Sequence, residues 1–109
     1  MIKVRAYETE DGVRPYENWF FALSSDAARR VEQAIRRMEL GNLADHKSLG
    51  EGVYERRIDF GPGYRVYFGK QGGRLIILLG GGTKKRQQAD IARAKHLWKQ
   101  YKKRKRTGD

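Results

Sequence analysis

A regular alternation of side chains across residues 53–60 and 64–68 restricts how the chain can fold. In an extended chain, odd-numbered residues of the first run point to one face and even-numbered residues to the other. In the second run, Tyr64, Val66 and Phe68 share a face. Gly61, Pro62 and Gly63 lie between the runs, where proline fixes φ and glycine permits positive φ. We therefore predict a β-hairpin.

The turn length sets the register of this hairpin. A three-residue turn pairs Phe60 with Tyr64 and Ile58 with Val66, which buries apolar side chains together. A slip of one residue would mix polar and apolar side chains. The predicted register places on the opposite, polar face the pairs Asp59–Arg65 and Arg57–Tyr67, together with Glu55. That face is the candidate site.

The remaining elements follow in order along the chain. Residues 2–7 alternate and predict a first strand, and helical spacing predicts two helices, one beginning at Pro15 and one ending at Gly41 and Asn42. Residues 42–52 are expected to form a loop. The unbroken aliphatic run at 75–79 predicts a central strand buried on both faces. A last helix is expected over residues 87–101. We predict one domain over residues 1–101 and a basic, disordered tail over 102–109.

The charge balance points to a polyanionic partner. The chain has 24 basic and 13 acidic residues, a net charge of +11 and a pI near 10.2. Residues 99–109 hold six basic residues and one acidic residue, so removing them still leaves +6. The basic character thus belongs to the domain as well as to the tail. Such a surface favours binding to nucleic acid. Alternatively, the charge serves only to keep the protein soluble or to bind an acidic protein.

Other sequence patterns exclude several classes of site. The triplet Gly80, Gly81 and Gly82 lacks the spacing of a phosphate-binding loop, but glycines there allow the backbone to pass close to another group. His46 and His96 lie outside any cluster of metal-ligand residues, so we expect neither a metal nor a cofactor. Cysteine is absent, and no apolar segment resembles a signal peptide or a membrane span. We expect a cytoplasmic protein with no membrane partner.

Two blocks, YERRIDFGPGYRVYFGK and ILLGGGTKKRQQADIARAKHLW, resemble the HigB-like addiction-module killer proteins of the RelE/ParE toxin superfamily, a phage-derived Gp49-like family. The resemblance extends from Tyr16 to Tyr101. It implies an α+β fold in the order β-α-α-β-β-β-α, with a mostly antiparallel four-stranded sheet and helices packed on one face. It also implies a toxin that cuts messenger RNA on the ribosome and is neutralised by a cognate helix-turn-helix, DNA-binding antitoxin.

The resemblance places a catalytic arginine of the sheet at Arg65, with Arg57, and either Lys84 or Lys85, near other basic positions of the family. Metal-independent RNA cleavage needs cations directed at the phosphate, where negative charge increases in the transition state. Glu55 is the first candidate for the general base, followed by Tyr67 or a lysine, and then His46. The residues expected to add RNA contacts are Lys85, Arg86, Lys102, Lys103 and Arg104.

Two other functions fit the same sequence. A ParE-like protein on this fold would inhibit DNA gyrase without any enzymatic activity. A plain RNA-binding module would use arginine and tyrosine side chains to contact phosphates and bases without cutting.

Overall fold

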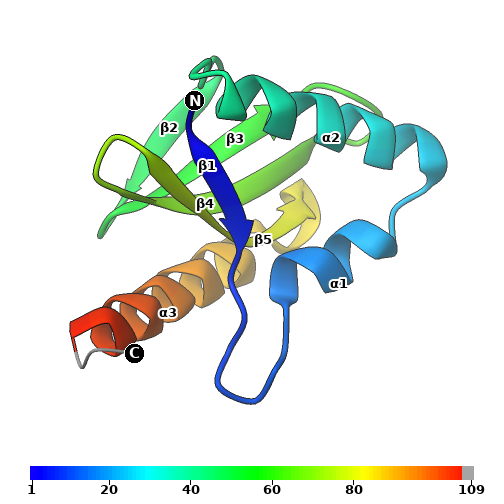
Figure 1. Ribbon diagram of the computed structural model, residues 1–109. Coiled ribbons are helices and arrows are strands. Elements are labelled where there is room, and N and C mark those ends of the chain that lie inside the picture. Colours follow the sequence, from blue (N-terminus) through cyan, green and yellow to red (C-terminus); the bar gives the residue numbers. More distant parts are fainter. Residues whose placement is uncertain (107–109) are drawn as a thin grey trace.

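The computed structural model describes residues 1–106 and confirms an α+β fold. Three helices surround one twisted sheet (Figure 1). The elements in chain order are β1 (Lys3–Ala6), α1 (Pro15–Phe21), α2 (Ser25–Glu39), β2 (His46–Gly50), β3 (Val53–Ile58), β4 (Tyr64–Gln71), β5 (Leu75–Thr83), the 3₁₀ turn η1 (Lys84–Arg86) and α3 (Gln87–Arg106).

The sheet has five strands in the order β1-β5-β4-β3-β2, so the expectation of a four-stranded sheet is wrong. The additional strand is β2, which pairs antiparallel with β3 and lies in the stretch expected to be a loop. Its residues are almost all exposed and polar, so β2 lacks the apolar alternation that marks a strand. The sheet is mixed, because β1 pairs parallel with β5 while the other neighbours are antiparallel. The strand β5 is central and buried, as the aliphatic run predicts.

The β3–β4 hairpin keeps the predicted faces but shifts the register by two residues. Ile58 is opposite Tyr64, Arg57 is opposite Arg65, and Glu55 is opposite Tyr67. The strands are joined by five residues, 59–63, because the Phe60 N–H donates to the Ile58 carbonyl at 3.0 Å and ends the pairing early. A shift of two residues leaves every side chain on its original face. The polar set therefore stays together, although its cross-strand partners differ from the predicted ones.

Helices α1 and α2 cover one face of the sheet. The Ser24 hydroxyl accepts from the Ala27 N–H at 3.3 Å and caps the start of α2. Gly41, with φ of 91°, ends α2 by donating to the Met38 carbonyl. The core on this side joins the two helices to β3, β4 and β5 through Tyr16, Val31, Ala34, Met38, Ile58, Val66, Phe68, Ile76 and Leu78.

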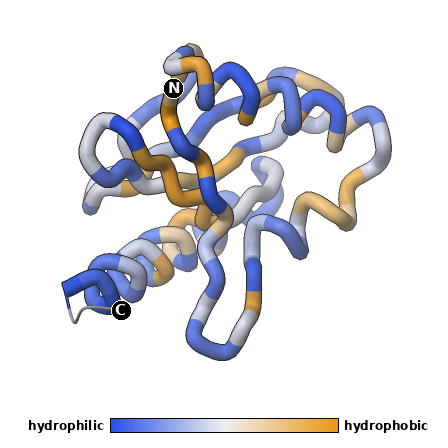
Figure 2. The backbone as a smooth tube through the Cα atoms, in the orientation of Figure 1, coloured by the Kyte–Doolittle hydropathy of each residue, from blue (hydrophilic) through white to orange (hydrophobic). Residues whose placement is uncertain are grey.

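Helix α3 packs on the opposite face, so the expectation that all helices lie on one side is wrong (Figure 1). Its core contacts involve Tyr7, Val53, Tyr67, Ile77, Leu79, Ala94, Leu97 and Trp98. The Trp98 ring lies so close to Gly69 and Gly52 that a Cβ on either glycine would overlap it. Figure 2 shows hydrophobic central strands and a largely hydrophilic second half of α3.

The last helix also extends further than the sequence indicates. It continues through Arg106, so residues 102–106 are helical and not disordered, while 107–109 lie outside the described residues. None of the helices in the described part of the chain combines the length and apolar character needed to cross a bilayer.

Candidate functional site

The candidate site is built around two arginines that face each other across the β3–β4 hairpin. Arg57 and Arg65 are register partners, so their side chains leave the same face of the sheet. Directly opposed like charges in an antiparallel pair are destabilising unless a negative group lies between or beside them. Within residues 1–106 Arg57 is exposed and forms no ion pair. The hairpin therefore presents one unneutralised guanidinium beside a second, buried one.

The Arg65 side chain forms an ion pair with the buried Glu55. The Arg65 Nε atom lies 3.6 Å from Glu55 Oε1, and the two side chains are only 9% and 1% exposed. The sequence predicts Asp59 as the partner of Arg65, but the two-residue shift leaves Asp59 in the turn. A carboxylate so completely buried is costly unless it is paired, so Glu55 and Arg65 depend on each other.

Tyr67 extends this buried polar cluster along β4. It is 1% exposed, it is the register partner of Glu55, and its hydroxyl has no hydrogen-bond partner in the described part of the chain. Burial, with the nearby charges of Asp90 and Glu55, raises the pKa of Tyr67 to about 12. The phenol is therefore neutral at physiological pH and can donate a hydrogen bond. Unpartnered buried polar groups of this kind are rare in folded proteins and mark candidate functional sites.

Asp90 belongs to this cluster and was missed by the sequence reasoning. It lies in the first turn of α3, and its carboxylate sits so close to Gly82 that a Cβ there would overlap it. Gly82 is the register partner of Arg65, so Asp90 enters the polar face beside that arginine. Burial raises the pKa of Asp90, while Arg86 and Arg93 oppose the shift. The only signal in the sequence was the glycine triplet, whose small residues admit the carboxylate.

The basic residues after β5 lie at the same end of the sheet. Thr83 is opposite Tyr64, the neighbour of Arg65, and the turn η1 follows at once. The Thr83 hydroxyl accepts from the Lys85 N–H at 3.4 Å and fixes the start of the turn. All three side chains of the turn are exposed: Lys84, Lys85 and Arg86. They form a second cationic group, which directly follows the part of β5 that pairs with Tyr64 and Arg65.

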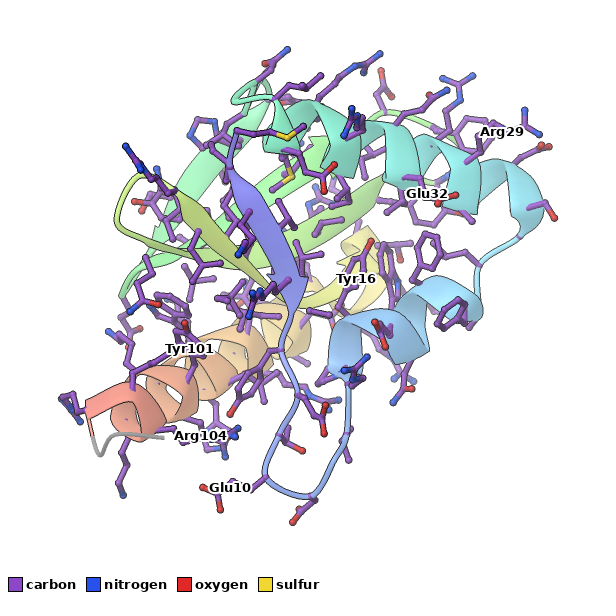
Figure 3. The ribbon with its side chains drawn as sticks, viewed as in Figure 1. Glu10, Tyr16, Arg29, Glu32, Tyr101 and Arg104 are labelled. Atoms are coloured by element: carbon purple, nitrogen blue, oxygen red, sulfur yellow. The ribbon has the colours of Figure 1, made fainter. Side chains whose placement is uncertain are left out.

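The other basic residues predicted to contact RNA lie elsewhere. Lys102, Lys103 and Arg104 come about 15–17 residues after the start of α3, roughly 22–26 Å along the helix at about 1.5 Å per residue. Arg104 donates to the Glu8 carbonyl at 2.8 Å and to the Tyr7 hydroxyl at 3.3 Å. Figure 3 shows Arg104 at the end of α3 that is nearest the loop carrying Glu10. This group and the arginine pair therefore belong to different ends of the molecule.

His46 is excluded from the site by its position. It pairs with Arg56 on β2 and β3, and its ring lies 6.1 Å from the Tyr54 ring, on the face covered by α2. The side chains of Arg57 and Arg65 leave the other face, so the suggestion that His46 acts as general base is wrong. Among residues 1–106, no group of three or more His, Asp or Glu side chains is arranged to hold a metal ion.

Two comparisons relate the chain to known proteins. Residues 18–105 match the family of phage-derived Gp49-like proteins. An uncharacterized protein of Haemophilus influenzae is 43% identical over 83 residues, which are 75% of this chain and 84% of that protein. The matched region contains the arginine pair, the turn η1 and nearly all of α3.

Proposed function

This chain belongs to the phage-derived Gp49-like family of RelE/HigB-like toxins, and we propose that it is a messenger RNA endoribonuclease. The toxin class comes from the family, and the activity is inferred from the site. The observation that carries the inference is the opposition of Arg57 and Arg65. Two arginine side chains that leave opposed positions on the same face favour an anion beside them, and a phosphodiester is the anion that suits forked donors.

The proposed reaction uses the substrate's own nucleophile. The 2′-oxygen attacks the adjacent phosphorus as it loses its proton, and the P–O5′ bond breaks as the 5′-oxygen gains one. The products are a 2′,3′-cyclic phosphate and a 5′-hydroxyl. Negative charge on the phosphate oxygens increases in the transition state, so Arg57, Arg65 and Lys84 stabilise it more than the ground state. Each such donor is worth roughly a hundredfold in rate.

Burial divides the roles of the remaining residues. Glu55 is 1% exposed and paired with Arg65, so we assign it to orienting that guanidinium. Tyr67 stays protonated at neutral pH, which suits a hydrogen-bond or proton donor and not a general base. Lys85 and Arg86 then hold the flanking phosphates of the RNA strand.

Membership of a toxin family implies an antitoxin as the partner of this chain. We propose that this antitoxin is a helix-turn-helix protein encoded beside the toxin, and that the ribosome presents the messenger RNA. A ribosome that fixes the substrate strand near the arginine pair would supply several kcal/mol through positioning. That contribution fits a site whose acid–base groups are largely buried.

The test is induction of the chain in growing bacteria, with transcript 5′ ends mapped and DNA breaks scored in the same culture. We expect discrete new transcript ends from the wild-type protein, about a hundredfold fewer from Arg57→Ala, and wild-type levels from Arg29→Ala. Both variants remove one exposed arginine, but Arg29 lies on α2, on the other side of the sheet.

Two outcomes would reject the proposal. DNA breaks with intact transcripts would identify a gyrase inhibitor. RNA binding without cuts or growth arrest would identify a plain binding module. Arg57→Ala is preferred to Arg65→Ala here, because loss of Arg65 leaves the Glu55 carboxylate buried without a partner.

A further inference from the structure

A cavity of about 270 Å³ is bordered by Tyr67 and Asp90 of the polar cluster, where α1 and α3 approach the end of β5. In the described part of the chain, β1 pairs with residues 75–78 of β5 and not beyond them. The β5 backbone at Gly80 and Gly81 therefore borders this cavity. The cavity is smaller than the roughly 300–1,000 Å³ of pockets for drug-sized ligands. It therefore suits a single planar ring system.

The polar lining of the cavity comes from four side chains: Asn18, Tyr67, Asp90 and Arg93. The Tyr67 hydroxyl is buried behind the wall of the cavity and has no hydrogen-bond partner among residues 1–106. Trp19 forms an apolar wall, and its indole fits against the backbone because Gly81 has no side chain. The lining thus combines a hydrogen-bond acceptor, several donors and a flat aromatic surface.

The charges of Asp90 and Arg93 limit which ligand can enter. Because Asp90 and Arg93 carry opposite charges, an anion or a cation would be attracted by one of them and repelled by the other. A neutral ring that presents N–H donors beside a carbonyl acceptor satisfies both residues at once. Guanine has this edge, because its ring N–H and exocyclic amine lie next to O6. The other bases lack this combination of two adjacent donors and one acceptor.

We propose that this cavity receives a guanine base of the RNA strand that is cut at the arginine pair, with Asp90 accepting from the base nitrogens and Arg93 donating to O6. The inference rests on the proposed function, which supplies the RNA. The cavity shares Tyr67 with the polar cluster, so a base held there belongs to a nucleotide near the phosphate bound by Arg57 and Arg65. Sequence preference of the toxin would then come from this cavity.

The test is an NMR titration of the full-length ¹⁵N-labelled protein with GMP, AMP, CMP and UMP at equal concentrations. The four nucleotides carry the same phosphate, so differences among them report the base. The chain has two tryptophans. We expect GMP to shift the Trp19 indole N–H and the Asn18 side-chain amide, while the Trp98 indole under α3 stays in place. The dissociation constant of GMP should be about tenfold lower than that of AMP.

Substitution at the cavity gives the second arm of the test. Asp90→Asn replaces one acceptor oxygen by a donor, and should remove the roughly tenfold preference for GMP over AMP. Arg29→Ala, on α2, should retain the preference. Equal shifts with all four nucleotides, or no shift of Trp19, would overturn the proposal, as would an Asp90→Asn protein that still prefers GMP.

Because no cleavage is needed for nucleotide binding, the two proposals fail separately. GMP binding at Trp19 in a protein that never cuts RNA would retain the cavity assignment and reject the nuclease. RNA cleavage by a protein whose Trp19 signal does not shift with any nucleotide would retain the nuclease and reject the cavity assignment.

Discussion

At the scale of single residues, burial separates side chains that the sequence presents as equivalent. Arg57 on β3 and Arg65 on β4 leave the same face of the sheet, and the alternation predicts that they lie together. The pattern does not show that Arg65 is 8% exposed and bound to Glu55, whereas Arg57 faces solvent. Asp90 was missed because its position depends on how α3 crosses Gly82, a contact between elements that no local pattern encodes.

Loss of Arg65 should destabilise the fold as well as the site. Arg65→Ala leaves the Glu55 carboxylate buried without a counter-charge, and we expect the free energy of unfolding to fall by about 3–5 kcal/mol. Arg57→Ala, at an exposed position, should change it by less than about 0.5 kcal/mol. Urea denaturation of the two variants measures the difference. Equal free energies of unfolding for the two variants would show that Glu55 does not need Arg65 as a counter-charge.

We expect that the Tyr67 hydroxyl does not stabilise the folded protein. The hydroxyl is buried without a protein partner. We therefore expect the free energy of unfolding of Tyr67→Phe, measured with urea, to equal that of the wild type or to exceed it by up to about 1 kcal/mol. The folded pKa of about 12 exceeds the usual value of 10.0, so unfolding releases a proton between these values. The wild-type stability should therefore fall as pH rises from 10 toward 12, and Tyr67→Phe should lose that part of the fall. Identical alkaline profiles would contradict this account.

At the scale of elements, side-chain patterns identified strands and helices well and their arrangement less well. The faces of β3 and β4 were predicted because alternation survives a two-residue shift, but the register was not, because a single Phe60–Ile58 hydrogen bond lengthens the turn. The strand β2 was missed because pairing with β3, and not burial, makes it extended. The aliphatic run of β5 already required cover on both faces, which α3 provides.

The packing of α3 against the sheet depends on Gly69. A Cβ at Gly69 would overlap the Trp98 ring, whereas a Cβ at Gly73 would meet nothing within 4 Å. We expect Gly69→Ala to lower the free energy of unfolding by about 1–3 kcal/mol, and Gly73→Ala to be neutral or slightly stabilising. Thermal denaturation of both proteins provides the comparison. An unchanged melting temperature for Gly69→Ala would mean that α3 can move away from the sheet without cost.

At the scale of the whole molecule, a net charge of +11 predicts RNA binding that weakens steeply with salt. Two groups of three exposed cations allow a matched comparison: Lys84, Lys85 and Arg86 in η1, and Lys102, Lys103 and Lys105 at the end of α3. Changing either group to glutamine removes the same charge. We expect both triple variants to reduce the salt dependence of RNA binding, measured by filter retention, by similar amounts.

Of these two groups, the η1 group directly follows the part of β5 that pairs with Arg65, so we expect its loss alone to reduce cleavage as well. Equal loss of cleavage in the two triple variants would indicate that general attraction of RNA, and not a local site, limits the reaction.

We propose that the opposed arginines of β3 and β4 hold the phosphodiester that is cut. This assignment is tested by chemical analysis of the ends formed when purified protein, ribosomes and a defined messenger RNA are incubated together. We expect 2′,3′-cyclic phosphate and 5′-hydroxyl ends, reduced about a hundredfold by Arg57→Ala and unchanged by Arg29→Ala. Ends bearing a 3′-hydroxyl and a 5′-phosphate, or cutting that is equally fast in Arg57→Ala, would contradict it.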